Sequence, residues 1–318
     1  MNTCSLDLAS LRSGPSRTSE PFAKPLLRKE TKNFHPSLSL SEAQDITNQA
    51  KSNLAFSLLC LPKENRDDVT IFYAFCRRID DIADEPNIPL LEKEAGLARW
   101  QSLFEGTLKD PEPLEATVLA LRDKHDIPHQ HFIHLIEGCR MDLHPQRFQS
   151  WEDLKGYTHR VASTVGLVCL PLFGAHHPDS IKYAEVLGHA LQLTNILRDI
   201  AEDLDNENRI YLPLDDMARF DYTEEDLRAH VYDERFKALM FYEAQRAEEL
   251  YGQAVDLLPP SDRRPLLAAE IMRSLYHRML EKMEMDDFRV FDRRYGLTKG
   301  RKIATLVMHS LRARFSNY

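Results

Sequence analysis

Apolar side chains recur every three to four positions along most of the chain, which is the period of an amphipathic α-helix. The pattern predicts one helix between an N-cap at Ser41 and a stop at Pro62, and a second helix over 64–84 that ends before Pro86 and Pro89. Further helices are expected at 90–108, 113–125, 129–141, 151–170, 179–205, 224–257 and 263–285, and after Lys299. We find no convincing strand alternation and no repeat of fixed period, so the sequence predicts a single all-α domain.

Composition supports this interpretation and divides the chain in two. Residues 1–40 are rich in Ser, Pro and Lys without apolar periodicity, so we expect a disordered N-terminal tail followed by a helical domain over 41–318. Only 11 of the 318 residues are glycine, which disfavours a fold rich in turns and hairpins. The longest uncharged run, 161–178, is interrupted by Pro171 and is interpreted as a buried helix and turn, not a membrane span.

Charge and cysteine usage restrict the partners and the compartment. The formal net charge of −9 disfavours a nucleic-acid partner. Residues 289–318, however, hold eight Lys or Arg and one Asp, which suits either a solvated helix face or contact with an anionic membrane or a phosphate group. The five scattered cysteines contain no Cys-x-x-Cys pair, and no secretory signal is visible. We therefore expect a cytoplasmic protein, with peripheral membrane contact left open.

The helix expected at 64–84 carries a polar stripe within an apolar surface. Tyr73, Arg77, Asp80 and Asp84 are spaced by 4, 3 and 4 residues, which places them on one helical face. Asp81 points about 100° away from that face and is expected nearer the surface. Apolar neighbours require burial of the helix, and a buried carboxylate pair is costly unless a cation compensates it. Taken alone, an acidic pair one turn apart is better explained by a solvated helix face, and the apolar neighbours make a metal site the alternative.

A second polar stripe lies on the helix expected at 179–205. Gln192, Asn195, Asp199 and Asp203 are spaced by 3, 4 and 4 residues and again share one face, with Arg198 directly before the acids. Carboxylate and amide oxygens suit Mg²⁺, with Mn²⁺ as a substitute, and arginine suits phosphate. If the two stripes face each other, like charges would repel without bridging cations. Two stripes therefore favour a metal site over a solvated face.

Several other site classes are disfavoured by missing motifs. No Glu lies three residues before a His, which disfavours a di-iron carboxylate bundle. The chain also lacks a Gly-x-Gly, a P-loop and a Gly-x-Ser-x-Gly, so nucleotide-binding fingerprints and a serine-hydrolase elbow are absent from the sequence.

Three segments together resemble the squalene/phytoene synthase family, the head-to-head prenyl-diphosphate synthases. They are YAFCRRIDDIAD at 73–84, YTHRVASTVG at 157–166 and QLTNILRDIAEDLDNENRIYLP at 192–213, and the resemblance covers about residues 50 to 305. It implies an all-α isoprenoid-synthase (terpenoid synthase) fold with a central cavity. It also implies two sets of Mg²⁺ ligands by motif position: Asp80 and Asp84 in the first, and Asn195, Asp199 and Asp203 in the second.

The resemblance assigns further residues to the substrate diphosphates and the reaction centre. Those implied to contact diphosphate or the metal shell are Gln192, Arg77, Arg198 and Arg293. Those implied to line the reaction centre are Tyr73, Tyr157 and Tyr276. The first helix departs from the family pattern, because many members have Ser-x-Ser-Phe where this chain has KSNLAF at 51–56. Ser52 or Asn53 would substitute there, so the first-helix ligands of the diphosphate stay open.

Small residues follow Tyr157 in the second segment. Ala162, Ser163 and Gly166 interrupt a helix that is otherwise rich in Val and Leu. Small side chains leave volume for an isoprenoid tail, or they allow two helices to pack closely, and the sequence does not separate the two.

The resemblance implies a Mg²⁺-dependent condensation of two prenyl diphosphates through a cyclopropylcarbinyl diphosphate. We expect two farnesyl diphosphates to give a squalene-type product, with phytoene synthesis from two geranylgeranyl diphosphates as the alternative. The final product, the use of NADPH and the oligomeric state stay open. A non-catalytic binding protein of the same fold is the alternative of another class. It is disfavoured because all five residues at metal positions are present.

Overall fold

A computed structural model describes residues 61, 63–144, 146–205 and 209–315. The expected N-terminal tail, the helix between Ser41 and Pro62, and the candidate ligands Ser52 and Asn53 lie outside these residues. Within the described ranges every regular element is helical and no strand occurs. The predicted all-α fold class is therefore confirmed.

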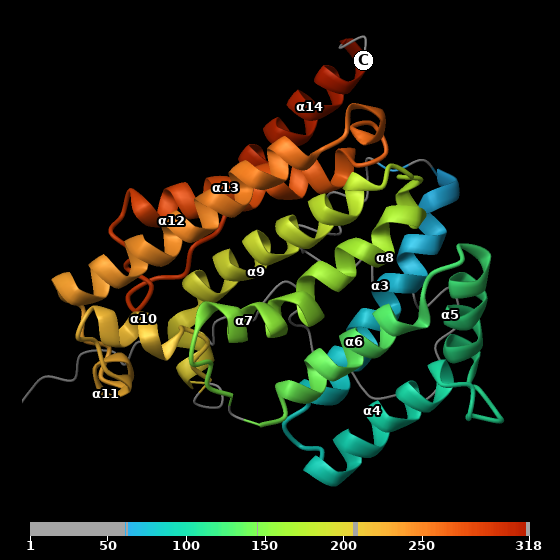
Figure 1. Ribbon diagram of the computed structural model, residues 1–318, viewed down its shortest axis with the longest axis horizontal. Helices are drawn as coiled ribbons and strands as arrows, with labels where there is room; N and C mark the ends of the chain where they lie inside the picture. The colour runs from blue at the N-terminus through green and yellow to red at the C-terminus, as the bar shows by residue number, and fades with distance from the viewer. Residues whose placement is uncertain (1–60, 62, 145, 206–208, 316–318) are drawn as a thin grey trace, which may run out of the picture.

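The helices follow one another with short connections and are coloured in chain order in Figure 1. They are α3 (Lys63–Asp84), α4 (Leu90–Phe104), α5 (Pro113–Lys124), α6 (His129–Met141), α7 (Trp151–Thr158), a π-helix η1 (His159–Ser163), α8 (Thr164–Phe173), α9 (Asp179–Asp205), α10 (Leu214–Arg219), α11 (Glu224–Arg228), α12 (Glu234–Leu257), a 3₁₀-helix η2 (Pro260–Asp262), α13 (Leu267–Glu284) and α14 (Lys299–Phe315).

Helix α9 is the central element of the bundle. It packs against α12 and α13 on one side and against α7, η1 and α8 on the other, as Figure 1 shows. Apolar residues recur around its circumference, and Leu193, Ile196 and Ile200 are all buried. A helix that is apolar on several sides is stable only when it is enclosed by neighbours. The polar stripe of α9 therefore lies inside the protein.

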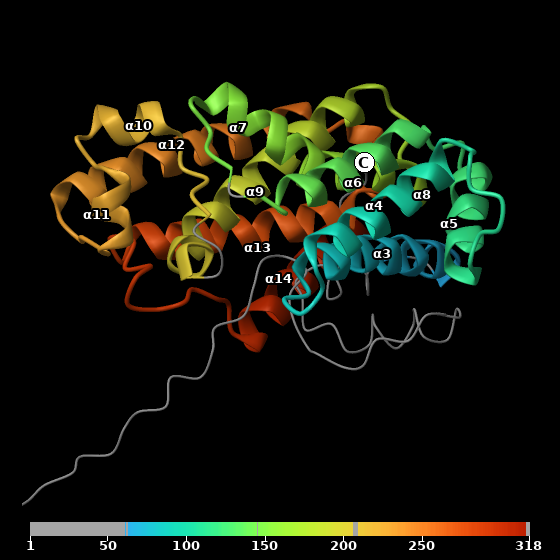
Figure 2. The ribbon, with the colours of Figure 1, turned by 90° about the horizontal axis from the view of Figure 1, so that it is seen from below.

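The remaining helices form the sides of this bundle. Helix α3 packs against α4, α5, α6 and α8, and α14 packs on α13 at the edge of the molecule (Figure 2). No helix in the described ranges is long and apolar enough to cross a membrane.

Two expected helices differ from the structure in informative ways. The helix expected at 151–170 is present as α7, η1 and α8 in direct succession and continues through Pro171 to Phe173. Gly174 ends it with a φ of 79°, and the Gly174 N–H donates to the carbonyl oxygens of the last helical turn. The helix expected at 224–257 is divided into α11 and α12, because the Asp233 side chain caps the N–H groups of Arg235 and Phe236 and starts a new helix. The short helix α10 was not expected from the sequence.

Candidate active site

The acidic turn of α3 carries both carboxylates and a compensating arginine. Arg77 lies 3.5 Å from the Asp80 carboxylate and 2.7 Å from that of Asp81. The side chain of Asp81 is 51% exposed, whereas those of Asp80 and Asp84 are 23% and 12% exposed. The prediction that Asp81 lies nearer the surface is therefore confirmed. The interior-facing carboxylates are Asp80 and Asp84.

The polar face of α9 is buried more deeply. Asn195, Arg198, Asp199 and Asp203 are all buried, and Arg198 holds both oxygens of the Asp199 carboxylate with its Nε and Nη2. The Asn195 amide donates to Gln192 Oε1 at 3.3 Å. Its own Oδ1 is buried and meets no hydrogen-bond donor among the described residues. A buried oxygen without a donor beside two aspartates fits a hard cation.

Arg209, in the connection after α9, joins the two acidic stripes. Its guanidinium lies 3.8 Å from the Asp84 carboxylate and donates to the carbonyl oxygen of Asp142 at 2.7 Å. Its backbone N–H donates to the carbonyl oxygen of Asp203 at 3.0 Å. The C-terminal ends of α3 and α9 therefore meet at one point. Arg209 thus supplies positive charge between the end of the α3 stripe and the end of the α9 stripe.

A cluster of one acid and two tyrosines lies beside Arg209. The hydroxyls of Tyr157 and Tyr211 donate to the two oxygens of Asp142 at 3.2 and 2.9 Å, and the rings are stacked at 5.0 Å. Burial raises the pKa of Asp142, and it raises the pKa of Tyr157 and Tyr211 well above the ordinary value. Both phenols are therefore neutral hydrogen-bond donors at physiological pH.

Asp142 and Tyr211 were not among the residues expected in the site. Asp142 directly follows α6, and Tyr211 lies in the connection between α9 and α10. Helical periodicity cannot place residues that lie outside helices. The only available signal was position, since Tyr211 lies within the third family-like segment.

Tyr276 of α13 lies beside Arg198 of α9. Tyr276 is buried on α13, and Arg198 also reaches the sulfur of Met279 one turn later at 3.8 Å. Burial alone would lower the pKa of Arg198, but Asp199 and the Tyr276 hydroxyl hold it above the ordinary value. Arg198 is therefore a permanent buried cation.

Among the expected site residues that the structure describes, Arg293 lies apart from the two acidic stripes. Its side chain is 54% exposed and pairs with Asp286 at 3.1 Å, away from the acidic stripes. The adjacent Arg294 instead lies 3.9 Å from Glu202, a buried residue of α9 between Asp199 and Asp203. The two neighbouring arginines therefore pair with different acids, because the segment after α13 is not helical and successive side chains leave it in different directions.

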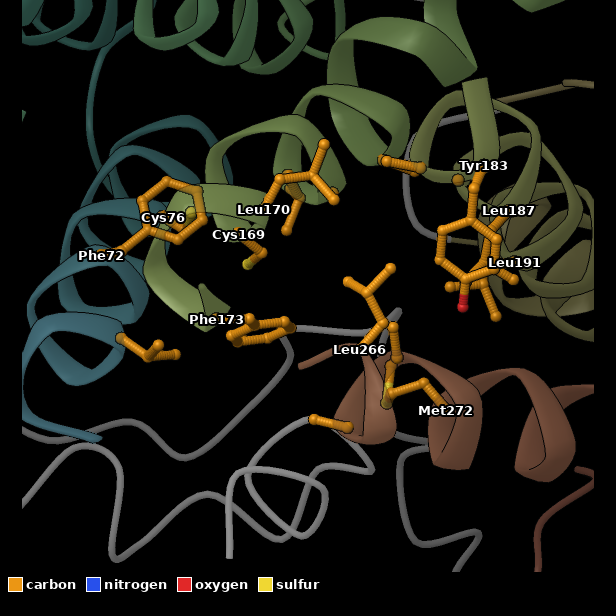
Figure 3. A pocket seen from close by; sticks show the side chains of 18 of the residues that line it. Phe72, Cys76, Cys169, Leu170, Phe173, Tyr183, Leu187, Leu191, Leu266 and Met272 are labelled. Carbon is orange, nitrogen blue, oxygen red and sulfur yellow. The ribbon is translucent and has the colours of Figure 1, made fainter. Parts of the chain in front are cut away.

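An apolar cavity with about 1030 Å³ of empty space, partly open to solvent, lies between α3, η1, α8, α9 and α13. Figure 3 shows Phe72, Leu170, Phe173, Leu187 and Leu266 directed into it. Tyr73, on the same face of α3 as Asp80, lines the cavity as well.

The small residues after Tyr157 serve both purposes that the sequence left open. Ala162 and Gly166 line the cavity. A Cβ on Gly188 of α9 would lie 2.3 Å from the Cα of Ser163, and one on Gly166 would lie 3.2 Å from the Cβ of Ala184. The same segment therefore packs tightly on α9 and leaves room beside it.

Thiol groups in the cavity wall are held in their protonated form. Cys76 of α3 and Cys169 of α8 both line the cavity. Burial, reinforced by Cys169, raises the pKa of Cys76 well above its ordinary value, and burial raises the pKa of Cys169 to about 12. The cavity therefore presents no thiolate nucleophile at physiological pH.

The donor set suits divalent cations held jointly with a phosphate ligand. Among the described side chains, no three from His, Cys, Asp and Glu converge as a complete metal site. The oxygens of Asp80, Asp84, Asp199 and Asp203 and the Oδ1 of Asn195 are nevertheless the donors that Mg²⁺ prefers. Mg²⁺ typically keeps several water or phosphate ligands, so an incomplete protein shell is compatible with such a cation.

Comparison with known proteins agrees with this arrangement. A model of the squalene/phytoene synthase family matches residues 47–301. The phytoene synthase of Arthrospira platensis is 36% identical over 290 residues, which cover 85% of this chain and 92% of that protein. The 15-cis-phytoene synthase of Synechocystis sp. is 34% identical over 319 residues and 93% of each chain.

Solved structures of the same family share the fold. A dehydrosqualene synthase in complex with ligand is 26% identical with a TM-score of 0.75, covering 87% of this chain and 97% of that one. A squalene synthase from Alicyclobacillus acidocaldarius is 25% identical with a TM-score of 0.69, covering 78% and 94%. The chain therefore belongs to the squalene/phytoene synthase family, whose members are prenyltransferases that join two prenyl diphosphates head to head.

Proposed function

We propose that this chain is a phytoene synthase, which condenses two geranylgeranyl diphosphates. The observation that carries this proposal is the identity of its relatives: phytoene synthases match at 33–36% identity over 79–93% of the chain. The dehydrosqualene and squalene synthases of known structure are less similar, at 25–26%. The C20 alternative is therefore better supported than the expected pair of C15 substrates.

The metal ions of this reaction are proposed to be Mg²⁺, with Asp80 and Asp84 on α3 and Asn195, Asp199 and Asp203 on α9 as the protein ligands. These residues would hold Mg²⁺, which when bound would supply positive charge for the departing diphosphate. The buried, donor-free Oδ1 of Asn195 supports this assignment, because it would otherwise lack an electrostatic partner.

Arginines of this chain are proposed to bind the diphosphates directly. Arg77, Arg198 and Arg209 each contact a carboxylate of the acidic stripes, so each places a guanidinium group beside a proposed metal ligand. Gln192 is held beside Asn195 and can donate to a phosphate oxygen. Fixed cations at the leaving group stabilise the charge that develops as the C–O bond breaks.

The apolar cavity is proposed to hold the prenyl chains and the carbocation that forms after diphosphate departure. Excluding water and ionised nucleophiles prevents the cation from being quenched before the second substrate's double bond attacks it. The wall supports this role, because both thiols are protonated and the other lining side chains are mostly apolar. The hydroxyls of Tyr73, Tyr157 and Tyr276 are proposed to orient the diphosphates.

Product identification tests the proposal. The purified full chain is incubated with Mg²⁺ and labelled geranylgeranyl diphosphate or farnesyl diphosphate, each with and without NADPH. Phytoene synthesis ends by proton loss and requires no hydride, so we expect phytoene from the C20 substrate without NADPH. A squalene or dehydrosqualene product from the C15 substrate, with the C20 substrate unreacted, would overturn the assignment.

A further inference from the structure

The apolar cavity has a far end that lies away from the two acidic stripes. Near the start of α3, the Asn65 amide donates to the Leu172 carbonyl oxygen at the end of α8, at 2.6 Å. Just before α13, the Asp262 carboxylate accepts the backbone N–H groups of His176 and His177, which precede α9, at 2.9 and 2.8 Å. The start of α3, the end of α8 and the starts of α9 and α13 therefore meet at this far end, whereas the acidic stripes lie toward the ends of α3 and α9.

The helical rise gives the depth of the cavity. Val69 and Tyr183 line the cavity at the far end, 11 residues before Asp80 on α3 and 12 residues before Asn195 on α9. At about 1.5 Å per residue, the far end lies about 16 to 18 Å from the proposed metal ligands. One extended isoprene unit, with four carbon–carbon bonds along the chain, measures about 5 Å, so a C15 chain spans about 15 Å and a C20 chain about 20 Å. A longer chain would have to pass the residues at the far end.

Phe173 is a bulky side chain at that end. Gly166, Cys169 and Phe173 are spaced by 3 and 4 residues along α8, which places them on one face, and all three line the cavity. The first two side chains are small, whereas the Phe173 ring is large and is directed into the cavity (Figure 3). Leu266, which precedes α13, is directed into the same space. The cavity is therefore open along α8 as far as Cys169 and narrows at Phe173.

The backbone around Phe173 is fixed on both sides. The preceding carbonyl oxygen, that of Leu172, accepts the hydrogen bond from Asn65 of α3. The following residue, Gly174, has a φ of 79° and donates its N–H to the Pro171 carbonyl oxygen at 3.1 Å. The Phe173 side chain is only 9% exposed. Moving the ring out of the cavity would break these contacts, so the ring forms a rigid stop.

We propose that Phe173 is a specificity-determining residue that sets the longest prenyl chain the enzyme accepts. Its ring contacts the last isoprene unit of a C20 chain and excludes a fifth unit by steric overlap. Phe173 lies at the opposite end of the cavity from the diphosphates and takes no part in the chemistry. The inference rests on the proposed function, in which this cavity holds the prenyl chains.

Kinetics of the purified full chain with Mg²⁺ and three substrates tests the proposal: farnesyl (C15), geranylgeranyl (C20) and geranylfarnesyl (C25) diphosphate. We expect the wild type to use the C25 substrate at least about 100-fold less well than the C20 substrate, judged by kcat/KM for pyrophosphate release. Phe173→Ala should raise the C25-to-C20 ratio at least about tenfold, because it opens room beyond the fourth unit. Phe173→Trp should lower the C20-to-C15 ratio at least about tenfold, because the larger ring shortens the cavity. Phe220→Ala, at a half-buried position after α10 where the ring packs on Tyr242, is the matched control and should keep both ratios.

Binding of unreactive analogues separates the fit of the chain from the rate of the chemistry. The analogues carry sulfur in place of the oxygen that joins the prenyl chain to the diphosphate, and calorimetry should show the same changes in the affinity ratios. If Phe173→Ala fails to fold, Phe173→Leu should shift the C25-to-C20 ratio in the same direction.

Two results would overturn the proposal: a wild type that uses the C25 substrate as readily as the C20 substrate, or a folded Phe173→Ala that keeps the wild-type C25-to-C20 ratio. A wild type that uses only the C15 substrate would overturn the phytoene synthase assignment instead. In that case the role of Phe173 is supported if Phe173→Ala gains activity with the C20 substrate, and it is overturned if Phe173→Ala gains none.

Discussion

The guanidinium of Arg209 lies 3.8 Å from the carboxylate of Asp84, although the two residues are 125 positions apart in the sequence. The Arg209 side chain also donates to the carbonyl oxygen of Asp142. The backbone N–H of Arg209 donates to the carbonyl oxygen of Asp203. A buried cation at this point reduces the repulsion between two acidic stripes before any metal or substrate binds.

Replacing Arg209 by Met should therefore impair both stability and catalysis. Its side chain is only 6% exposed, so the variant leaves the Asp84 carboxylate without its buried cation. We expect the free energy of unfolding to fall by about 2–3 kcal/mol. Urea denaturation gives the value, with Arg228→Ala as a control: its pairs with Glu224 and Glu225 are partly exposed, and its loss should cost about 0.5 kcal/mol at most. Equal losses in the two variants would contradict the role given to Arg209.

Asp84 and Asp81 provide a matched pair within one motif. Asp84→Asn removes an interior carboxylate that we assign to the metal, and we expect pyrophosphate release from geranylgeranyl diphosphate to fall at least about 100-fold. Asp81 is half-exposed and pairs with Arg77, so Asp81→Asn should reduce the rate less than about tenfold. A steady-state assay at saturating Mg²⁺ checks both variants. A larger loss for Asp81→Asn would reverse the assignment.

Two glycines should respond oppositely to alanine. A Cβ at Gly188 would lie 2.3 Å from the Cα of Ser163, so Gly188→Ala must displace η1 from α9 and should cost about 3 kcal/mol or more. Gly252 in α12 has open space around it, and Gly252→Ala should stabilise the protein by about 0.5–1 kcal/mol. Thermal and urea unfolding of both variants measure the difference. A neutral Gly188→Ala would show that the close approach of η1 and α9 is not rigid.

Glu243 predicts a pH dependence of stability. It is fully buried on α12 beside Asp216 and Arg246, and burial raises its pKa from 4.5 to about 8. Between these values the native carboxyl keeps a proton that the unfolded chain has lost. The associated stability is fully present below pH 4.5 and is lost as the pH rises through about 8.

We therefore expect the wild type to lose up to about 2 kcal/mol of unfolding free energy between pH 6 and pH 8 relative to Glu243→Gln. Urea denaturation at the two pH values measures this difference. Glu249→Gln, an exposed position on the same helix, should retain the wild-type dependence. If Glu243→Gln also retains the wild-type pH dependence, the prediction is wrong, and Arg246 keeps Glu243 ionised in the native state.

The cavity thiols should be unreactive in the native protein. With a pKa of about 12, Cys169 is almost entirely protonated at pH 8, and the thiol is a poor nucleophile. We expect iodoacetamide to alkylate it at least about 100-fold more slowly than free cysteine, as followed by mass spectrometry of the Cys169 peptide. Unfolding in urea should restore the ordinary rate. Rapid native labelling would show that the cavity wall opens to solvent.

The sequence by itself determined the helical class, most helix positions and the two polar stripes, because these depend on local periodicity. The bounds expected for 129–141 and 179–205 agree with α6 and α9. The prediction from apolar periodicity failed where a polar side chain capped the backbone and started a new helix. Asp233 caps a new helix where continuous apolar spacing suggested a single one.

Only the tertiary structure decided which residues meet. Asp142, Arg209 and Tyr211 lie in connections, where no periodicity fixes direction, and they converge because the ends of α3, α6 and α9 come together. The same holds for Arg294, which follows α13 and lies 3.9 Å from Glu202 of α9. A helical repeat specifies which side of a helix is buried, but the partner across that face is chosen by the packing of distant segments.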